Sequence, residues 1–248
     1  MNALESVGRR QFVPGSGVTN LQHLVTSALG LVLVGTLSAC GGATIDMKGD
    51  FPAPLVEPIP LHMGLYLDPA LLAYKHIEKI DQQGTWEVDV GTIQPNLFRT
   101  VVHAMFTSVS ELSAPPPTSA VDAVLAPSIE EFQMTIPAQT RSNFYEVWIK
   151  YQMALYQPDG TVIAKWPLTA YGKSNREDFG VFAKKDDVAV REATVNALRD
   201  AGAFLSLRFR RVPEIKAWLD ARALAPPTAA PAEPAALPAA APNEENPS

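Results

Sequence analysis

Hydrophobic and polar positions between residues 61 and 112 predict strands followed by a helix. Apolar side chains alternate with other residues over 61–67 and again over 85–90, and a weaker strand is expected over 75–80. After Gly91 and Thr92, apolar residues recur at spacings of three and four, which predicts a helix with one apolar face. Its apolar positions are Phe98, Val101, Val102, Met105 and Val109.

The second half of the chain predicts three strands and then helices. The strands are expected over residues 121–136, 144–156 and 161–171. Pro158, Asp159 and Gly160 are typical of a hairpin turn between the last two strands. A long helix is expected over 187–208 and a short one over 212–219. This order predicts an α+β fold, an antiparallel or mixed sheet with two main helices packed on one face.

The first forty residues predict an export signal. Arg9 and Arg10 precede an uncharged apolar run of 14 residues, Leu24–Leu37, whereas a membrane-spanning helix needs about 20 residues. A positive start, a short apolar run and small residues at its exit are typical of a secretory signal peptide. The exit reads Leu37, Ser38, Ala39 and Cys40, followed by Gly41, which resembles the lipobox of bacterial lipoproteins. The alternative is a lone core cysteine after a buried helix.

The lipobox resemblance implies a membrane anchor without a membrane-spanning helix. It makes Leu37, Ser38, Ala39 and Gly41 the recognition residues of the signal peptidase, and Cys40 the acylated N-terminus carrying diacylglyceryl and palmitate-type chains. Each buried methylene of such chains contributes about 0.8 kcal/mol, so two or more chains hold firmly. Glycine rather than aspartate at position 41 implies the periplasmic face of the outer membrane.

The arginine pair before the apolar run has three interpretations. Arg9 and Arg10, followed by Gln11, Phe12 and Val13, resemble the twin-arginine export signature. The alternatives are an ordinary charged signal-peptide start, which would use the general secretory route, or a misassigned upstream start codon.

Composition divides the chain into four parts. We expect a lipoprotein signal peptide over 1–39, a lipidated N-terminus and proline-containing tether over 40–60, a periplasmic domain over 61–222 and an Ala/Pro-rich tail over 223–248. Residues 225–248 contain seven prolines and nine alanines, so this segment is expected to stay extended and disordered. It could serve as a spacer, a partner-binding tail or a solvated overhang.

Composition and motifs argue against several function classes. The net charge of −6 disfavours nucleic-acid binding, and the single cysteine excludes an intramolecular disulfide and a CxxC redox pair. We find no catalytic motif, and we expect no enzyme activity, cofactor or metal. His62 and His76, with Glu78 or Asp68, are the candidate metal ligands, and isolated histidines of this kind are more often structural.

The predicted hairpin carries an unusual concentration of aromatic residues: Tyr145, Trp148, Tyr151, Tyr156, Trp166 and Tyr171. Alternation divides them between two faces, of which one is expected to be core. An exposed second face would be a binding surface. A further candidate is the cationic group Arg208, Arg210 and Arg211. These arginines suit a helix C-terminus, and the alternative is an anion contact to a lipid phosphate or a peptidoglycan carboxylate.

The lipobox, the proline-rich tether and the element order resemble the YajG-like and ABC-transport-auxiliary (LptE-like) outer-membrane lipoproteins. The similarity is strongest over Val121–Leu219. It implies a non-catalytic accessory protein that docks onto an envelope-assembly or lipid-transport complex. The alternative function is a carrier that holds a lipid or glycan between the sheet and the helices.

Overall fold

The computed structural model describes residues 42–118, 121–179 and 185–224. The predicted signal peptide, the lipobox from Leu37 to Gly41, the twin-arginine motif and residues 225–248 of the predicted tail lie outside the described residues. The elements are β1 (Ala43–Ile45), β2 (Ile59–Tyr66), α2 (Pro69–Leu72), β3 (His76–Ile80), β4 (Gly84–Val88), η1 (Val90–Thr92), α3 (Gln94–Met105), β5 (Phe106–Leu112), β6 (Ala123–Thr135), α4 (Pro137–Thr140), β7 (Phe144–Tyr156), β8 (Val162–Asn175), η2 (Arg176–Asp178), α5 (Lys185–Arg208), η3 (Phe209–Arg211) and α6 (Pro213–Leu224).

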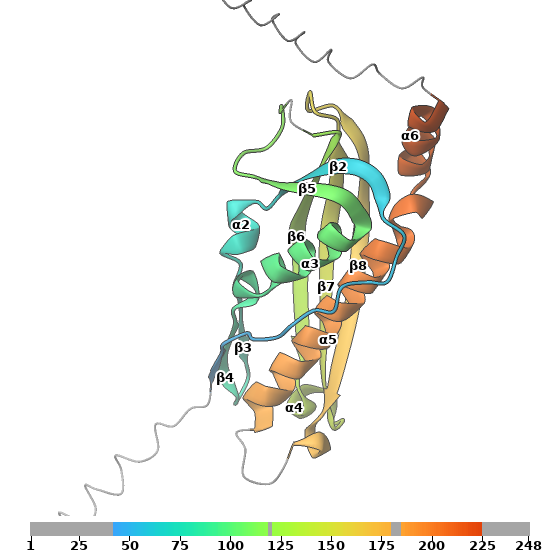
Figure 1. Ribbon diagram of the computed structural model, residues 1–248. Helices are drawn as coiled ribbons and strands as arrows, with labels where there is room; N and C mark the ends of the chain where they lie inside the picture. Colours follow the sequence, from blue (N-terminus) through green and yellow to red (C-terminus); the bar gives the residue numbers. More distant parts are fainter. Residues whose placement is uncertain (1–41, 119–120, 180–184, 225–248) are drawn as a thin grey trace, which may run out of the picture. The chain divides into compact units, whose positions relative to one another are not determined.

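Five strands form the main sheet in the order β5-β2-β6-β7-β8. β2 runs parallel to both of its neighbours, whereas β6, β7 and β8 are antiparallel, so the sheet is mixed. Helices α3 and α5 lie on one face of it (Figure 1). The predicted α+β fold, with a mixed sheet and two main helices on one face, is confirmed.

A second, three-stranded sheet has the order β1-β4-β3. Residues 77–87, with residues 42 and 43, form a small compact unit separate from the larger one. Within this small unit β3 and β4 are joined by a turn in which Gln82 and Gly84 adopt positive φ angles of 60° and 79°. Glycine at position 84 accommodates this conformation without steric cost.

The helix-covered face of the main sheet is the core of the larger unit. On β7 every second side chain faces the core and is buried: Tyr145, Val147, Ile149, Tyr151, Met153 and Leu155. Alanines on α5, among them Ala193 and Ala197, are fully buried against the sheet. The helix approaches Gly172 of β8 so closely that a Cβ atom there would lie 2.1 Å from the carbonyl oxygen of Ala193. Glycine is therefore required at this crossing.

Helix α5 also covers part of the outer edge of β8. The backbone N–H of Tyr171 donates to Asp200 Oδ2 at 3.0 Å, and Asn196 Nδ2 donates to the carbonyl of Lys173 at 3.1 Å. Pro167 lies four residues before Tyr171, so its nitrogen faces the same edge, where the missing N–H costs no ladder bond. Side chains of α5 and one proline thus occupy edge positions that are otherwise open to another strand.

Two of the sequence predictions that differ from the structure concern α3 and the tether. The helix predicted to reach Val109 ends at Met105, and residues 106–112 form β5 instead. Val109 has the spacing of a helix residue but lies in a strand, and the partner of this strand, β2, is distant in sequence. In addition, the stretch expected to be a free tether up to residue 60 contains Ile45, Met47 and Phe51, which are all buried. Arg191 Nε of α5 donates to the carbonyl of Asp46 at 2.8 Å, so this stretch belongs to the folded domain.

Candidate functional site

The face of the main sheet opposite α3 and α5 is the candidate site, and we call it the open face. On β7 it is formed by the residues that alternate with the core positions: Phe144, Glu146, Trp148, Lys150, Gln152, Ala154 and Tyr156. Most of them are partly or fully exposed, and Ala154 is the exception. Part of this face above β2 is covered, because Leu112 and Val121 pack over Gly64. The remainder contains two hollows.

The first hollow surrounds Trp148 and has a volume of about 400 Å³. Trp148 pairs with Tyr171 across the β7–β8 ladder, and the centroids of their rings are 5.1 Å apart. The Tyr171 hydroxyl donates to Glu146 Oε1 at 2.6 Å. Burial, and then the hydrogen bond and the charge of Glu146, raise the pKa of Tyr171 to about 12. The tyrosine is therefore a neutral donor at physiological pH, and the carboxylate is held in place beside the rings.

Polar side chains border this aromatic pair. Gln133, Thr135 and Thr169 line the hollow. Lys150 Nζ lies 2.8 Å from Glu130 Oε2, and the hydrogen bond and charge of this carboxylate raise the pKa of Lys150. Both partners are well exposed, so the pair contributes little to stability. An aromatic centre with a polar border is the composition typical of protein-binding surfaces.

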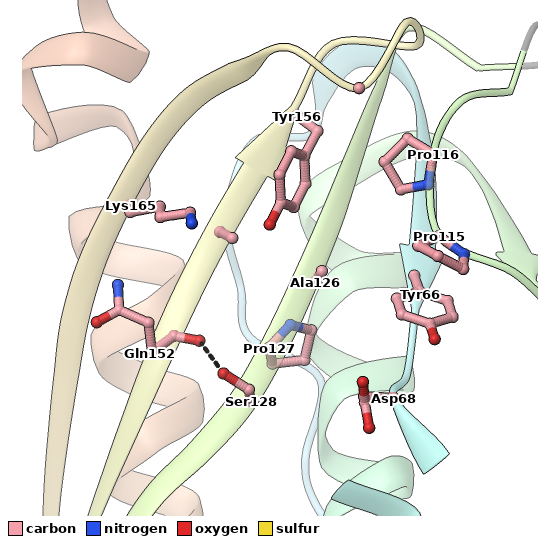
Figure 2. A pocket seen from close by; sticks show the side chains of 12 residues that line it. Tyr66, Asp68, Pro115, Pro116, Ala126, Pro127, Ser128, Gln152, Tyr156 and Lys165 are labelled. Atoms are coloured by element: carbon pink, nitrogen blue, oxygen red, sulfur yellow. Dashed lines mark hydrogen bonds between the residues drawn. The ribbon is translucent and has the colours of Figure 1, made fainter. Parts of the chain in front are cut away.

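The second hollow has a volume of about 460 Å³ and lies near the β7–β8 turn (Figure 2). Tyr66, at the end of β2, and Tyr156, at the end of β7, stand on opposite sides of Ala126 and Pro127 (Figure 2). We call this hollow the tyrosine pocket. Its remaining lining residues are Asp68, Pro115, Pro116, Ser128, Gln152, Ala154, Gly160 and Lys165.

The six aromatic residues of the predicted hairpin divide between the two faces. Trp148, Tyr156 and Tyr171 lie on the open face, as the hypothesis of a second binding face requires. Tyr145 and Tyr151 are only 2% and 0% exposed. Trp166 pairs with the core residue Met153 and contacts Phe209. Tyr145, Tyr151 and Trp166 therefore do not contribute to the open face, which corrects their inclusion in a single surface.

The buried tyrosines have structural partners. The Tyr151 hydroxyl donates to Gln94 Oε1 at 2.9 Å, and its ring meets the ring of Phe98 edge-on at 5.3 Å. The Tyr145 hydroxyl donates to Asp186 at the start of α5. Burial, followed by Tyr74 for Tyr151 and by Asp186 for Tyr145, raises the pKa of each hydroxyl. Both residues join the sheet to the helices.

The three candidate arginines lie at the end of α5, around the buried Phe209. Arg208 stacks over the ring of Phe204 at 4.5 Å, and an Arg210 guanidinium nitrogen lies 3.5 Å from the carbonyl oxygen of Glu57. Arg211 is exposed. Phe209 packs against Phe106 and Trp166, so the arginines belong to the helix side of the sheet and not to the open face.

The histidines considered as metal ligands lie in different sheets. His62 Nε2 is 2.8 Å from the Ser110 hydroxyl, whereas the ring of His76 lies 4.7 Å from that of Phe132. Over residues 42–118, 121–179 and 185–224, no group of three potential ligand residues could hold a metal ion. No helix among these residues is long and apolar enough to cross a membrane.

Sequence reasoning missed Tyr66, Gln133 and Lys165. Tyr66 was detectable from the alternation of this strand. Leu65 and Leu67 are buried, so the residue between them faces the opposite side of the strand. Gln133 and Lys165 carry no comparable signal, since isolated polar residues are common on any exposed strand.

Solved structures resemble the fold at low sequence identity. No protein-family model and no curated protein matches the chain. One similar solved structure is a "putative lipoprotein" from Caulobacter crescentus CB15, with 12% identity and a TM-score of 0.36, covering 53% of this chain and 84% of the other. Another is a hypothetical protein from Chlamydia trachomatis, with 12% identity and a TM-score of 0.34, covering 58% and 96%. Likeness at this level assigns no function.

Proposed function

We propose that this chain is a lipid-anchored periplasmic accessory protein of the cell envelope. It docks a protein of an envelope-assembly or lipid-transport complex through the open face of its main sheet. The proposal includes acylation at Cys40, attachment to the outer membrane and a non-catalytic role. It also retains the resemblance to the YajG-like and ABC-transport-auxiliary lipoproteins.

One observation supports the docking role most strongly. The Trp148–Tyr171 pair lies on the open face, whereas α3 and α5 cover the other face of the main sheet. Tyr171 is 36% exposed although it is a large aromatic residue. Aromatic side chains with a polar border are favoured anchors in protein interfaces because they bury a large area at a small entropic cost.

The core supports docking over the alternative of carrying a ligand between sheet and helices. Tyr151, Phe98 and Gln94 fill the centre of that space and are each at most 1% exposed. Gln94 is held from both sides, because its Nε2 also donates to the carbonyl of Leu71 at 2.5 Å. A lipid or glycan would have to displace these contacts.

The test uses Trp148→Asp and the matched control Leu207→Asp, which places the same charge at a 63% exposed residue of α5. Each variant is crosslinked in intact cells, and the crosslinked partners are quantified. We expect one dominant envelope protein to be captured by the wild type and by Leu207→Asp, but not by Trp148→Asp. Equal capture by both variants contradicts docking on the open face. Native mass spectrometry that shows a retained lipid or glycan instead supports the carrier function.

The anchor is tested separately. We expect Cys40→Ser to release the protein from the membrane fraction or to mislocalise it. Globomycin, which blocks lipoprotein signal peptidase, should leave the wild-type precursor unprocessed. Normal processing in treated cells contradicts the lipoprotein assignment.

A further inference from the structure

The tyrosine pocket is a groove lined by two tyrosine rings and by small alanine side chains. Its floor is the pair Ala126 and Ala154, which face each other across the β6–β7 ladder. Tyr66 and Tyr156 stand on opposite sides of Ala126 (Figure 2), and the small side chains of the two alanines leave room in the lining of the groove. The groove therefore arises from a local combination of small and large residues on neighbouring strands.

One wall of the groove is fixed by the turn between β7 and β8. Pro115 and Pro116 line it, and the backbone N–H of Thr118 donates to the carbonyl of Pro158 at 2.7 Å. A Cβ on Gly160 would come within 4.0 Å of the Pro116 backbone. The proline wall and the turn thus support each other, and the groove exists before any ligand binds. Preformed grooves bind at a lower entropic cost.

The lining favours an extended, proline-containing peptide. Tyrosine rings and prolines offer flat apolar surfaces, and polyproline II segments dock into aromatic-lined grooves of this type. Such segments have no internal hydrogen bonds, so their carbonyls accept from donors on the protein. Within the described residues the hydroxyls of Tyr66 and Tyr156 form no hydrogen bond, and both line the groove. They are available as donors.

The chain itself contains a segment of this chemistry. Residues 225–248 have seven prolines and nine alanines, and they include the sequence Pro231-Ala-Glu-Pro234. A polyproline II helix has three residues per turn, which places Pro231 and Pro234 on the same edge. That spacing allows both rings to enter one groove, while the intervening alanine adds little bulk.

The position of α6 brings this segment within reach. Arg222, near the end of α6, donates to Asp122 Oδ1 at 2.7 Å. Asp122 precedes Ala126 by four residues, which is roughly 13 Å along a strand. From Leu224 to Pro231 the chain spans seven residues, or about 22 Å if it is fully extended as polyproline II. The extended segment is therefore longer than the distance from Asp122 to Ala126.

The charges are complementary. Residues 225–248 contain Glu233, Glu244 and Glu245 and no lysine, arginine or histidine. Lys165 lines the groove, is exposed and forms no ion pair with any residue that the structure describes. Glu233 lies between the two prolines, so it is the acidic residue nearest to the groove when they are bound.

We propose that the tyrosine pocket binds residues 225–238 of the same chain as a polyproline II ligand. Pro231 and Pro234 contact the rings of Tyr66 and Tyr156, and Glu233 lies beside Lys165. The contact is intramolecular and goes beyond the proposed docking function, because it requires no envelope partner. Where docking holds, the bound segment occupies one end of the open face and leaves the Trp148 hollow free.

The test uses the full-length chain, purified from whichever cell fraction contains it. Tyr156 is replaced by the photocrosslinking residue p-benzoylphenylalanine, and a matched control carries it in place of Tyr171 on the same face. After illumination at high dilution, we expect the probe at 156 to crosslink to residues 225–238 within the monomer. The probe at 171 should not. Absence of this crosslink, equal crosslinking from both positions, or crosslinks only between chains would overturn the proposal.

A second set of variants leaves the folded domain unchanged. Replacing Pro231 and Pro234 together by alanine should lower the yield of the crosslink from position 156 by about fivefold or more, because both ring contacts are lost. Replacing Pro242 and Pro247 together is the matched control and should leave the yield unchanged. Equal yields from the two double variants would show that the contact is unspecific, and the assignment of Pro231 and Pro234 would be wrong.

Discussion

The two faces of the main sheet use similar residues for different purposes. On the covered face, Tyr151 is fully buried and donates to Gln94. On the open face, Tyr171 has a comparable hydrogen bond to Glu146 but remains 36% exposed. One hydroxyl thus satisfies a buried polar group, and the other positions a carboxylate that water already solvates. Strand alternation therefore separates residues that hold the fold from residues available for recognition.

The largest expected effect is the difference in stability loss between replacing Tyr151 and replacing Tyr171 by alanine. Tyr151→Ala should lower the free energy of unfolding by about 3–5 kcal/mol, because it leaves a cavity beside Phe98. Tyr171→Ala should lower it by only about 1 kcal/mol, since half-exposed side chains bury less area. Urea unfolding followed by circular dichroism measures both values. Similar losses for the two variants would show that the open face also carries the stability of the fold.

Removing only the hydroxyls gives a smaller contrast. Tyr151→Phe leaves Gln94 Oε1 buried without its donor, and we expect a loss of about 1–3 kcal/mol. Tyr171→Phe leaves Glu146 in contact with water, so its cost should be below about 0.5 kcal/mol. Thermal unfolding at pH 7 provides the comparison. A neutral Tyr151→Phe variant would mean that water or another donor replaces the hydroxyl.

Alkaline pH should lower the free energy of unfolding through the buried tyrosines of the covered face. Burial raises the pKa of Tyr145 and Tyr151 above the ordinary value of about 10. Below pH 10 both hydroxyls are protonated in the folded and unfolded states. Above it the unfolded state loses protons first, so the free energy of unfolding should fall by up to about 1.4 kcal/mol per pH unit for each tyrosine.

Unfolding titrations from pH 9 to pH 12 test this dependence. Tyr151→Phe should give a shallower decline than the wild type, because one titrating group is missing. Tyr171 contributes in the same direction, with a pKa of about 12, but its exposure limits the effect. An unchanged slope in Tyr151→Phe would contradict the role assigned to burial.

The smallest expected effect is the coupling between Trp148 and Tyr171. These residues are direct cross-strand partners, and such pairs contribute about 0.2–1 kcal/mol. A double-mutant cycle with Trp148→Ala and Tyr171→Ala measures the coupling free energy. A larger value would mean that the pair is part of the structural core and not a surface for a partner.

The hairpin was the most predictable part of the fold. The strand predicted over residues 144–156 matches β7 residue for residue, because clear alternation ends at a strong turn signal. β5 was missed because Val109 continues the helical spacing of α3, and its pairing with β2 is not encoded in the local pattern. The buried Phe51 was also missed, since the prolines around it are typical of a solvated linker.

The candidate site was predictable only in part. Both faces of β7 carry aromatic residues, so sequence alone could divide them but could not decide which face α5 covers. That choice depends on the close approach of the α5 backbone to Gly172, a contact between segments that are about twenty residues apart in sequence. The tyrosine pocket depends on Ala126, Ala154 and two distant tyrosines, which share no motif.

The covered margin of β8 has a consequence for how densely these molecules can be packed. An unprotected strand margin would allow chain-to-chain sheet growth when molecules meet at high concentration. Asp200, Asn196 and Pro167 lie at that margin. Two molecules that meet there therefore do not extend each other's sheets into a fibre.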